Sequence, residues 1–232
     1  MDNIGLYYLV FLVVVGIGGI VLLTWLRKMQ QRRRFDQEAS ARGWRYDDTG
    51  WLGSSYRFSG TTGGDIAWMA ECVASSGGDE VSSTIYQTRW WSQAISLPDR
   101  LVLIGPRMPV AGVLPVTLQG GLLGGTLVRT FLRQIFGDDA DRLGGMGETL
   151  IGSEVFGQRY MVYAHDTHDE SRLLGMGVEP ALLDWPKQHP LAVKLGGNEL
   201  TIWLPSLEIT QITQVEQILN LGIRMVNAWR SM

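Results

Sequence analysis

The side chains best suited to chemistry gather in one short segment, residues 165–170, which reads HDTHDE and holds two of the three histidines. Imidazole and carboxylate groups are ligands that zinc and other divalent metals accept. His165, His168, Asp169 and Glu170 are therefore candidate metal ligands, and a small metal-dependent hydrolase is one function they would serve. The alternative is a polar turn after a strand, with Thr167 or Asp169 capping the next helix. Their spacing favours the turn, so we expect no metal and no other cofactor.

Other catalytic motifs are missing from the sequence. The glycine-rich stretch GGLLGGT at 120–126 precedes an expected helix but lacks the lysine of a phosphate-binding loop. No GxSxG motif occurs, and the single cysteine, Cys72, falls in an expected strand without an adjacent base. The sequence therefore predicts no catalytic residue. One cysteine also excludes an intramolecular disulfide, which fits a reducing compartment.

An uncharged apolar run extends from residue 4 to residue 26. At about 1.5 Å per helical residue it would measure about 34 Å, enough to cross a hydrocarbon core of about 30 Å. Five basic residues follow it within eight positions, and none precedes it. The positive-inside rule then places the N-terminus outside and the remaining chain in the cytoplasm. We expect a single transmembrane helix and not a cleaved signal peptide, which would carry its basic residues first.

The basic cluster after the run consists of Arg27, Lys28, Arg32, Arg33 and Arg34. It acts as a topology signal, and it would also attract anionic lipid headgroups at the membrane surface. The charged, glutamine-rich residues that follow are typical of a helix that continues out of the bilayer. Gly43 is a suitable stop for that helix. Residues 27–43 are therefore interpreted as a basic juxtamembrane helical segment.

Residues 44–232 are predicted to form one cytoplasmic α+β domain. Beyond residue 34 the chain carries fifteen basic and twenty-two acidic side chains, a net charge of −7, which disfavours nucleic acid as a partner. Short β-rich segments separated by glycine-rich turns predict an antiparallel sheet that starts as a meander. We expect strands at the following ranges: 44–47, 55–59, 66–73, 83–97, 100–104, 160–164, 192–195 and 200–204.

Three helices are expected beside the sheet, at 126–136, 171–183 and the C-terminus. The last has apolar residues at a period near 3.6 from Ile212 to Trp229, which predicts an amphipathic helix that covers one sheet face. Thr213 and Glu216 have the spacing of a capping box at its start. The uncharged segment from Met108 to Val128 contains prolines and many glycines, so it is interpreted as a loop; contact with the bilayer or a partner is the alternative.

Two adjacent tryptophans, Trp90 and Trp91, fall on an expected strand. Neighbouring strand residues point to opposite faces, so at most one of them enters the core of a sheet covered on one side. The other is either covered by a loop, which we favour, or available to a partner.

The segments RGWRYDD, DRLVLIGPR, FGQRYMVYAHDTHDESRLL and GGNELTIWL, between one N-terminal apolar helix and a C-terminal amphipathic helix, resemble a group of bacterial single-pass membrane proteins of unknown function. The resemblance implies a bacterial inner-membrane protein without catalytic residues. The sequence thus predicts a non-enzymatic domain tethered to the lipid bilayer, which acts with a protein partner as scaffold, sensor or accessory subunit. The metal-dependent hydrolase remains the alternative, and a lipid-binding module comes third.

Overall fold

The computed structural model describes residues 3–49, 55–76, 84–95, 97–107, 147–149, 151–164 and 177–230. Inside these ranges, side chains are not described for residues 3–12, 14, 17, 20, 21, 75, 76, 84, 85, 97–100 and 147–149. The expected helix at 126–136 and the segment from Met108 to Val128 lie outside the described residues.

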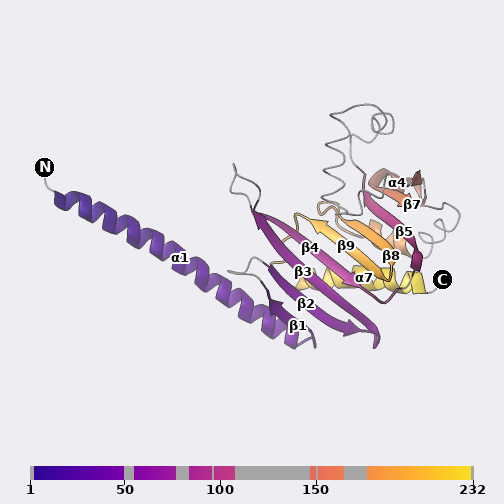
Figure 1. Ribbon diagram of the computed structural model, residues 1–232, viewed down its shortest axis with the longest axis horizontal. Helices are drawn as coiled ribbons and strands as arrows, with labels where there is room; N and C mark the ends of the chain where they lie inside the picture. Colours follow the sequence, from indigo (N-terminus) through magenta and orange to yellow (C-terminus); the bar gives the residue numbers. More distant parts are fainter. Residues whose placement is uncertain are drawn as a thin grey trace, which may run out of the picture.

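The N-terminal part of the chain is one long helix, α1 (Asn3–Ser40), which extends away from the sheet (Figure 1). The apolar run and the basic segment after it are thus continuous, as predicted. The chain leaves the helix through a turn that ends at Gly43, whose φ of 72° favours glycine. Among the described residues, no helix is both long enough and apolar enough to cross a membrane. Many side chains between residues 4 and 26 are outside the described set, so the predicted span stays a prediction.

The rest of the described chain is α+β, built on one antiparallel sheet of nine strands in the order β1-β2-β3-β4-β9-β8-β5-β7-β6. The strands have these bounds: β1 Arg45–Asp48, β2 Ser55–Thr62, β3 Ile66–Ser76, β4 Thr84–Ser92, β5 Leu97–Pro106, β6 Gly147–Thr149, β7 Tyr160–Ala164, β8 Ala192–Gly197 and β9 Glu199–Pro205.

The predicted meander is confirmed for β1 to β4, which pair in chain order. It was wrong for the fifth strand: β5 leaves β4 and pairs between β8 and β7, while β9 takes the place beside β4. The expected single strand over 83–97 is also broken, because β4 ends at Ser92. The hydroxyl of Ser92 donates to the carbonyl of Ala67 at 2.7 Å and accepts from the backbone N–H of Ala94, which turns the chain out of the sheet.

The described helices all pack on one side of the sheet, which we call the inner face. They are α1, α4 (Glu154–Arg159), α6 (Val178–Leu183) and α7 (Ile212–Arg230). α7 crosses β3, β4 and β9, α6 packs on α7, and the end of α1 packs on β1 and α7. In Figure 1 α7 runs behind the strands. The opposite side of the sheet, which we call the outer face, carries none of these four helices.

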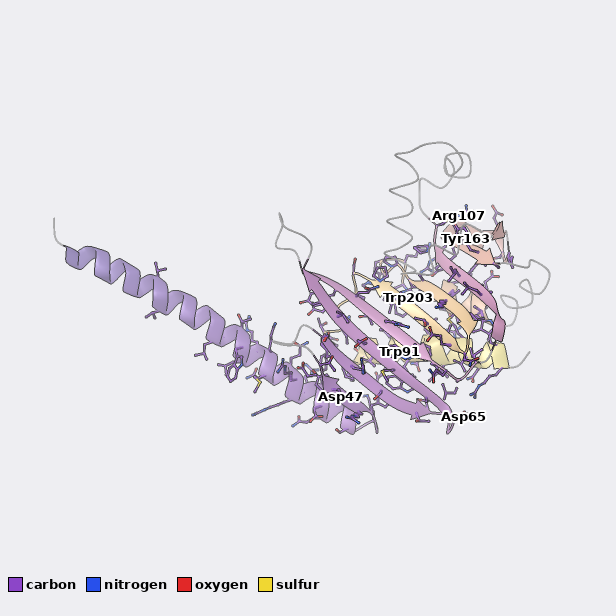
Figure 2. All side chains as sticks on the ribbon, viewed as in Figure 1. Asp47, Asp65, Trp91, Arg107, Tyr163 and Trp203 are labelled. Atoms are coloured by element: carbon purple, nitrogen blue, oxygen red, sulfur yellow. The ribbon has the colours of Figure 1, made fainter. Side chains whose placement is uncertain are left out.

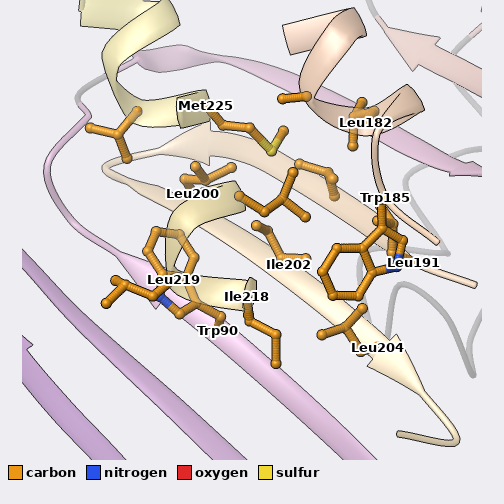
Figure 3. Packing of buried hydrophobic residues seen from close by; sticks show 14 of the residues in the cluster. Trp90, Leu182, Trp185, Leu191, Leu200, Ile202, Leu204, Ile218, Leu219 and Met225 are labelled. Atoms are coloured by element: carbon orange, nitrogen blue, oxygen red, sulfur yellow. The ribbon is translucent and has the colours of Figure 1, made fainter. Parts of the chain in front are cut away.

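The core lies between α7 and the inner face. Its centre is Trp90 of β4, which is fully buried and packs among aliphatic side chains from the strands and α7 (Figure 3). The predicted apolar stripe of the C-terminal helix is confirmed, since Ile212, Val215, Ile218, Leu219 and Trp229 are all buried. The closest approach is at Gly222, where the absence of a side chain admits the indole of Trp90.

The predicted capping box of α7 was wrong. Glu216 forms an ion pair with Arg42 at the end of α1, with 2.6 Å between nitrogen and oxygen, and does not reach the start of α7. The amide oxygen of Gln214 instead accepts from the backbone N–H groups of Thr210 and Gln211. Gln214 therefore performs the role that the sequence assigned to Glu216, and the glutamate is used to connect α1 and α7.

Two short elements were not predicted, α4 and β6. Ser153 caps α4 by accepting from the backbone N–H of Phe156 at 3.2 Å, and Phe156 is fully buried against Tyr160. The helix expected over 171–183 is described only as α6, and residues before Gly177 in that range lie outside the described chain.

Candidate functional site

The candidate metal ligands His165, His168, Asp169 and Glu170 lie outside the described residues. Across the described ranges, no group of three or more histidine, cysteine, aspartate or glutamate side chains is placed to hold a metal ion. The described surface offers two other features: the place where α1 joins the domain, and a cluster on the outer face of the sheet.

The basic residues after the apolar run are not equivalent. Arg32 forms an ion pair with Asp48 of β1 at 2.5 Å, and Arg34 pairs along the helix with Glu38 at 2.6 Å. Arg27 and Arg33 are exposed. Arg32 therefore holds the helix against the domain, whereas Arg27 and Arg33 extend from its surface.

The last turns of α1 belong to the domain core. Phe35 is 2% exposed, and its ring centroid lies 5.4 Å from that of Phe58 in an edge-on arrangement. It also lies 5.8 Å from Tyr56 and 5.9 Å from Tyr46. Ala39, one turn later, is fully buried. Aromatic contacts of this kind add to the burial of large apolar surface, so α1 and the sheet form one rigid unit here.

The tyrosines at this joint are held in their neutral form. Burial, reinforced by the charge of Asp48, raises the pKa of Tyr46 to about 12. Burial also raises the pKa of Tyr56 above its ordinary value, and the Tyr56 hydroxyl donates to the backbone carbonyl of Ile209 at 2.5 Å. Tyr46 and Tyr56 are therefore neutral at neutral pH, and they serve the joint by packing.

The outer face carries a row of alternating charges across four neighbouring strands, and a tryptophan on the fifth strand continues the row. Strand register places Asp47, Arg57, Glu71, Arg89 and Trp203 side by side. In the middle of the row, Arg57 and Glu71 form an ion pair with 2.8 Å between nitrogen and oxygen. Further along the sheet, on β5 and β8, outer-facing Leu103 and Ala192 are buried. Thr201 of β9 is also fully buried on this face, and exposed outer-facing side chains, such as Arg45, Ala67 and Gln87, lie over β1 to β4.

Arg89 ends the row between two tryptophans. Its guanidinium carbon lies 5.0 Å from the ring of Trp91 on the same strand and 5.6 Å from the ring of Trp203 on β9. Both distances are within the range of cation–π attraction. Figure 2 shows the two tryptophans on neighbouring strands in the middle part of the sheet. We call Arg89, Trp91, Trp203, Lys194 and Glu199 the Arg89 cluster.

The positive charges of this cluster exceed its negative charge. Glu199 is its one carboxylate, and it lies 3.7 Å from Arg89 and 3.8 Å from Lys194. Both distances are longer than the 2.8 Å of the Arg57–Glu71 pair, and 40% of the Arg89 side chain is exposed. A partly exposed guanidinium that lies close to two indoles is able to bind a carboxylate from outside the chain.

The prediction for the tryptophan pair is confirmed in its geometry. Trp90 enters the core on the inner face, and Trp91 lies on the outer face, where it is partly buried. Its described cover is the side chain of Arg89, and part of the indole remains accessible. Both alternatives for Trp91, cover by a loop and accessibility to a partner, stay open.

No protein-family model, curated protein or solved structure matches the chain. The function is therefore inferred from the geometry of this molecule. The Arg89 cluster was missed at the level of sequence, because Trp203 and Glu199 reach Arg89 only through the pairing of β4 with β9. The signal available was the alternation of Arg89 and Trp91 on one face of an expected strand.

Proposed function

We propose that this protein is a non-enzymatic binding protein, tethered to a bacterial inner membrane by residues 4–26, with its N-terminus outside and its α+β domain in the cytoplasm. The uncharged run and the basic residues that follow it support the tether and its orientation. The domain then works as an accessory subunit that presents one surface to a protein partner in or at the membrane.

The observation that carries this proposal is the burial of Phe35 and Ala39 in the domain core. A domain on a flexible linker samples many orientations, and its surfaces face all directions in turn. Here the helix that leaves the apolar run enters the core without a break, and the Arg32–Asp48 and Arg42–Glu216 ion pairs flank the joint. The domain is therefore held in one orientation relative to the helix, which suits the presentation of a fixed surface.

The surface we assign to the partner is the Arg89 cluster. Tryptophan and arginine are the residues most enriched among those that dominate binding energy at protein interfaces. The cationic guanidinium of Arg89 beside two indoles favours an acidic side chain of the partner as the complementary group. The chemistry of this cluster is that of recognition, since a stacked guanidinium between indoles supplies no nucleophile and no general base.

The tether is tested by cell fractionation and by a reporter fused after Met232. We expect the full chain to resist extraction from membranes by alkaline carbonate, and the reporter to be active in the cytoplasm. Release of the chain by carbonate would refute the tether. A reporter active only in the periplasm would refute the orientation.

The partner surface is tested by charge reversal. The full chain is purified in mild detergent as wild type, Arg89→Glu and the matched control Arg45→Glu, which changes an exposed arginine of the outer face on β1. We expect a protein that is retained by wild type and Arg45→Glu and lost with Arg89→Glu, and whose binding returns when one of its acidic residues is changed to lysine. Equal retention by all three variants, or no rescue, would refute this surface.

A further inference from the structure

The charged row of the outer face is complementary to itself when it is reversed. From β1 to β4 its members are Asp47, Arg57, Glu71 and Arg89, so the charges alternate from negative to positive. In the direction from β4 to β1 they alternate from positive to negative. A second copy of the row, laid over the first in the reverse direction, therefore places an opposite charge in front of every member.

The four charged side chains are accessible to such a copy. Between 23% and 40% of each of them is exposed. Asp47 already pairs with Arg45 at 2.9 Å, but 76% of the Arg45 side chain is exposed, and ion pairs on an open surface contribute little. A carboxylate accepts about four hydrogen bonds, so Asp47 is able to bind a second arginine while it keeps the first.

The charges determine which twofold axis relates the two copies. The axis lies between the two sheets, parallel to the strands, and passes between β2 and β3. Asp47 then faces Arg89 of the second copy, and Arg57 faces Glu71 of the second copy. An axis that passes over β2 or β3 places Arg57 or Glu71 opposite itself. An axis across the strands places all four charges opposite themselves, which is repulsive.

The same axis suits two chains that are anchored in one membrane. Phe35 of α1 packs on Phe58 at the inner face, and in Figure 1 α1 runs in nearly the same direction as β1 to β3. Rotation about an axis parallel to the strands keeps the strand direction, so both α1 helices leave the pair toward the same side. Rotation about an axis across the strands sends them toward opposite sides. The position of α1 on the inner face also leaves the outer face free for contact.

We propose that the partner of the Arg89 cluster is a second copy of this chain, whose β1 to β4 pack on the outer face as an aligned sheet about 10 Å away. Asp47 of the second copy is the acidic group that binds Arg89. Beside the charged row, Ser59 faces Met69 of the second copy, a small side chain against a large one. Trp203, one strand beyond Arg89, lies beside the edge strand β1 of the second copy. This proposal rests on the proposed function, because it names the partner of the surface assigned there.

The area of this contact makes the tether necessary. Four strands about 4.8 Å apart, with about six residues of about 3.3 Å each, give a face of about 400 Å² per copy. A standard interface buries about 800 Å² on each partner. Two copies held in one membrane meet at a high effective concentration, which compensates for the smaller area. The pair is therefore expected in membranes, and the test is made there.

The test is chemical cross-linking of the full chain in isolated membranes. Cys72→Ala is the common background, and a single cysteine is introduced at Ala67 or at Gln37, both of which are exposed. Ala67 lies on the outer face of β3 beside the proposed axis, so its two copies are within reach of a short bismaleimide. Gln37 of α1 is the matched control, because the pair places the two α1 helices on its two outward sides.

Two charge reversals then test which residues face each other. In a pair of Arg89→Glu chains, both contacts oppose two acidic groups, and in a pair of Asp47→Arg chains both oppose two arginines. We expect each variant alone to lower cross-linking at Ala67 by about tenfold. When the two variants are expressed together with different tags, both contacts of the mixed pair again join opposite charges. We expect cross-linking between the two tags to return to the wild-type level.

Three results would overturn the second copy as partner: cross-linking at Ala67 no stronger than at Gln37, no loss with the single variants, or no recovery in the mixed pair. If a different protein is retained by the wild type and lost with Arg89→Glu, the surface of the proposed function stands with that protein as its partner. If neither a second copy nor another protein depends on Arg89, the surface fails as well. Ser59→Cys, on β2 across the axis, repeats the measurement if Ala67→Cys fails to fold.

Discussion

Gly222 is the residue at which α7 comes closest to the sheet, and replacing it tests the packing of the core. A Cβ at this position would lie 2.4 Å from Cη2 of Trp90, 2.5 Å from Cζ2 and 2.6 Å from Cζ3. Carbon atoms in contact prefer about 3.5–4.0 Å, so Gly222→Ala requires either the indole or the helix to move by about 1 Å. Trp90 is fully buried, with no free space to accept that movement.

The expected cost combines two opposing effects. Overpacking a dense core costs about 1–3 kcal/mol, and an approach of 2.4 Å to a fully buried ring places Gly222→Ala in the upper part of that range, about 2–3 kcal/mol. Alanine is favoured over glycine inside a helix by about 0.8–1.0 kcal/mol, so we expect Gly222→Ala to lower the free energy of unfolding by about 1–2 kcal/mol. For a domain of this size the loss lowers the melting temperature by about 2–8 °C.

The assay is thermal unfolding of the full chain in detergent, followed by circular dichroism. Gly157→Ala is the matched control, because Gly157 also lies inside a helix but has no atom within 4 Å of the position its Cβ would take. We expect the control to keep or raise the melting temperature. Trp90→Phe, combined with Gly222→Ala, should cost less than the sum of the two single changes. Equal melting temperatures for Gly222→Ala and Gly157→Ala would refute the close approach.

Three further outcomes follow from the same contacts. Phe35→Ala should lower the free energy of unfolding by about 3–5 kcal/mol because Phe35 is a core residue, and exposed Gln37→Ala should leave it nearly unchanged; denaturant titration separates them, and equal effects would contradict the packing of α1 into the domain. Ile218→Ala removes a fully buried side chain of α7 and should cost about 2–5 kcal/mol, measured by thermal unfolding of the full chain; an unchanged midpoint would mean that the α7 stripe does not cover the core. Burial raises the pKa of Tyr46 and of Tyr160 to about 12, above the value of about 10 expected in the unfolded chain, so their contribution to stability is complete below pH 10 and is lost as the pH rises from 10 to 12; denaturant midpoints that stay constant up to pH 12 would refute this.

Elements whose structure is determined by residues close together in the sequence could be predicted. The α7 stripe repeats at the helical period, and the β2–β3 and β8–β9 hairpins follow from alternating residues around glycines. Gly63, Gly64 and Gly197 have positive φ at these turns, a conformation that glycine adopts without the steric cost of a side chain. In each of these cases the information lies within a few residues of the element itself.

The position of β5 was not predictable, because strand order depends on contacts between distant parts of the chain. Its residues have strand propensity wherever it pairs, and a meander is the simplest continuation of β1 to β4. The observed sheet places the β8–β9 hairpin beside β4, so β5 pairs on the far side of that hairpin. This arrangement buries Val102 and Ile104 on the inner face, level with Leu195 and Val193.

The candidate site was also predictable only where the information lies close together in the sequence. The position of Trp91 on the outer face could be predicted from the alternation along β4, since Trp90 takes the inner face. The charged residues beside Trp91 could not be predicted, because Glu199 and Lys194 belong to a hairpin more than a hundred residues away in sequence. The sequence also did not show that the basic segment contacts the domain. Arg32 has its partner, Asp48, on β1, and that ion pair forms only when α1 lies against the sheet.

Within the proposed function, the joint at Phe35 restricts what α1 is able to transmit to the domain. Because α1 is one helix whose last turns are core residues, a tilt or rotation of its N-terminal part must move the sheet as a body or break contacts worth several kcal/mol. Moving the whole domain costs little, whereas breaking the joint costs a large share of a typical domain stability of 5–15 kcal/mol. If the proposed tether is right, a signal that passes through α1 is expected to change the direction in which the Arg89 cluster faces, and not the folding of the domain. Within the proposed function, a sensor role would operate through that change of orientation, and an accessory role would rely on its constancy.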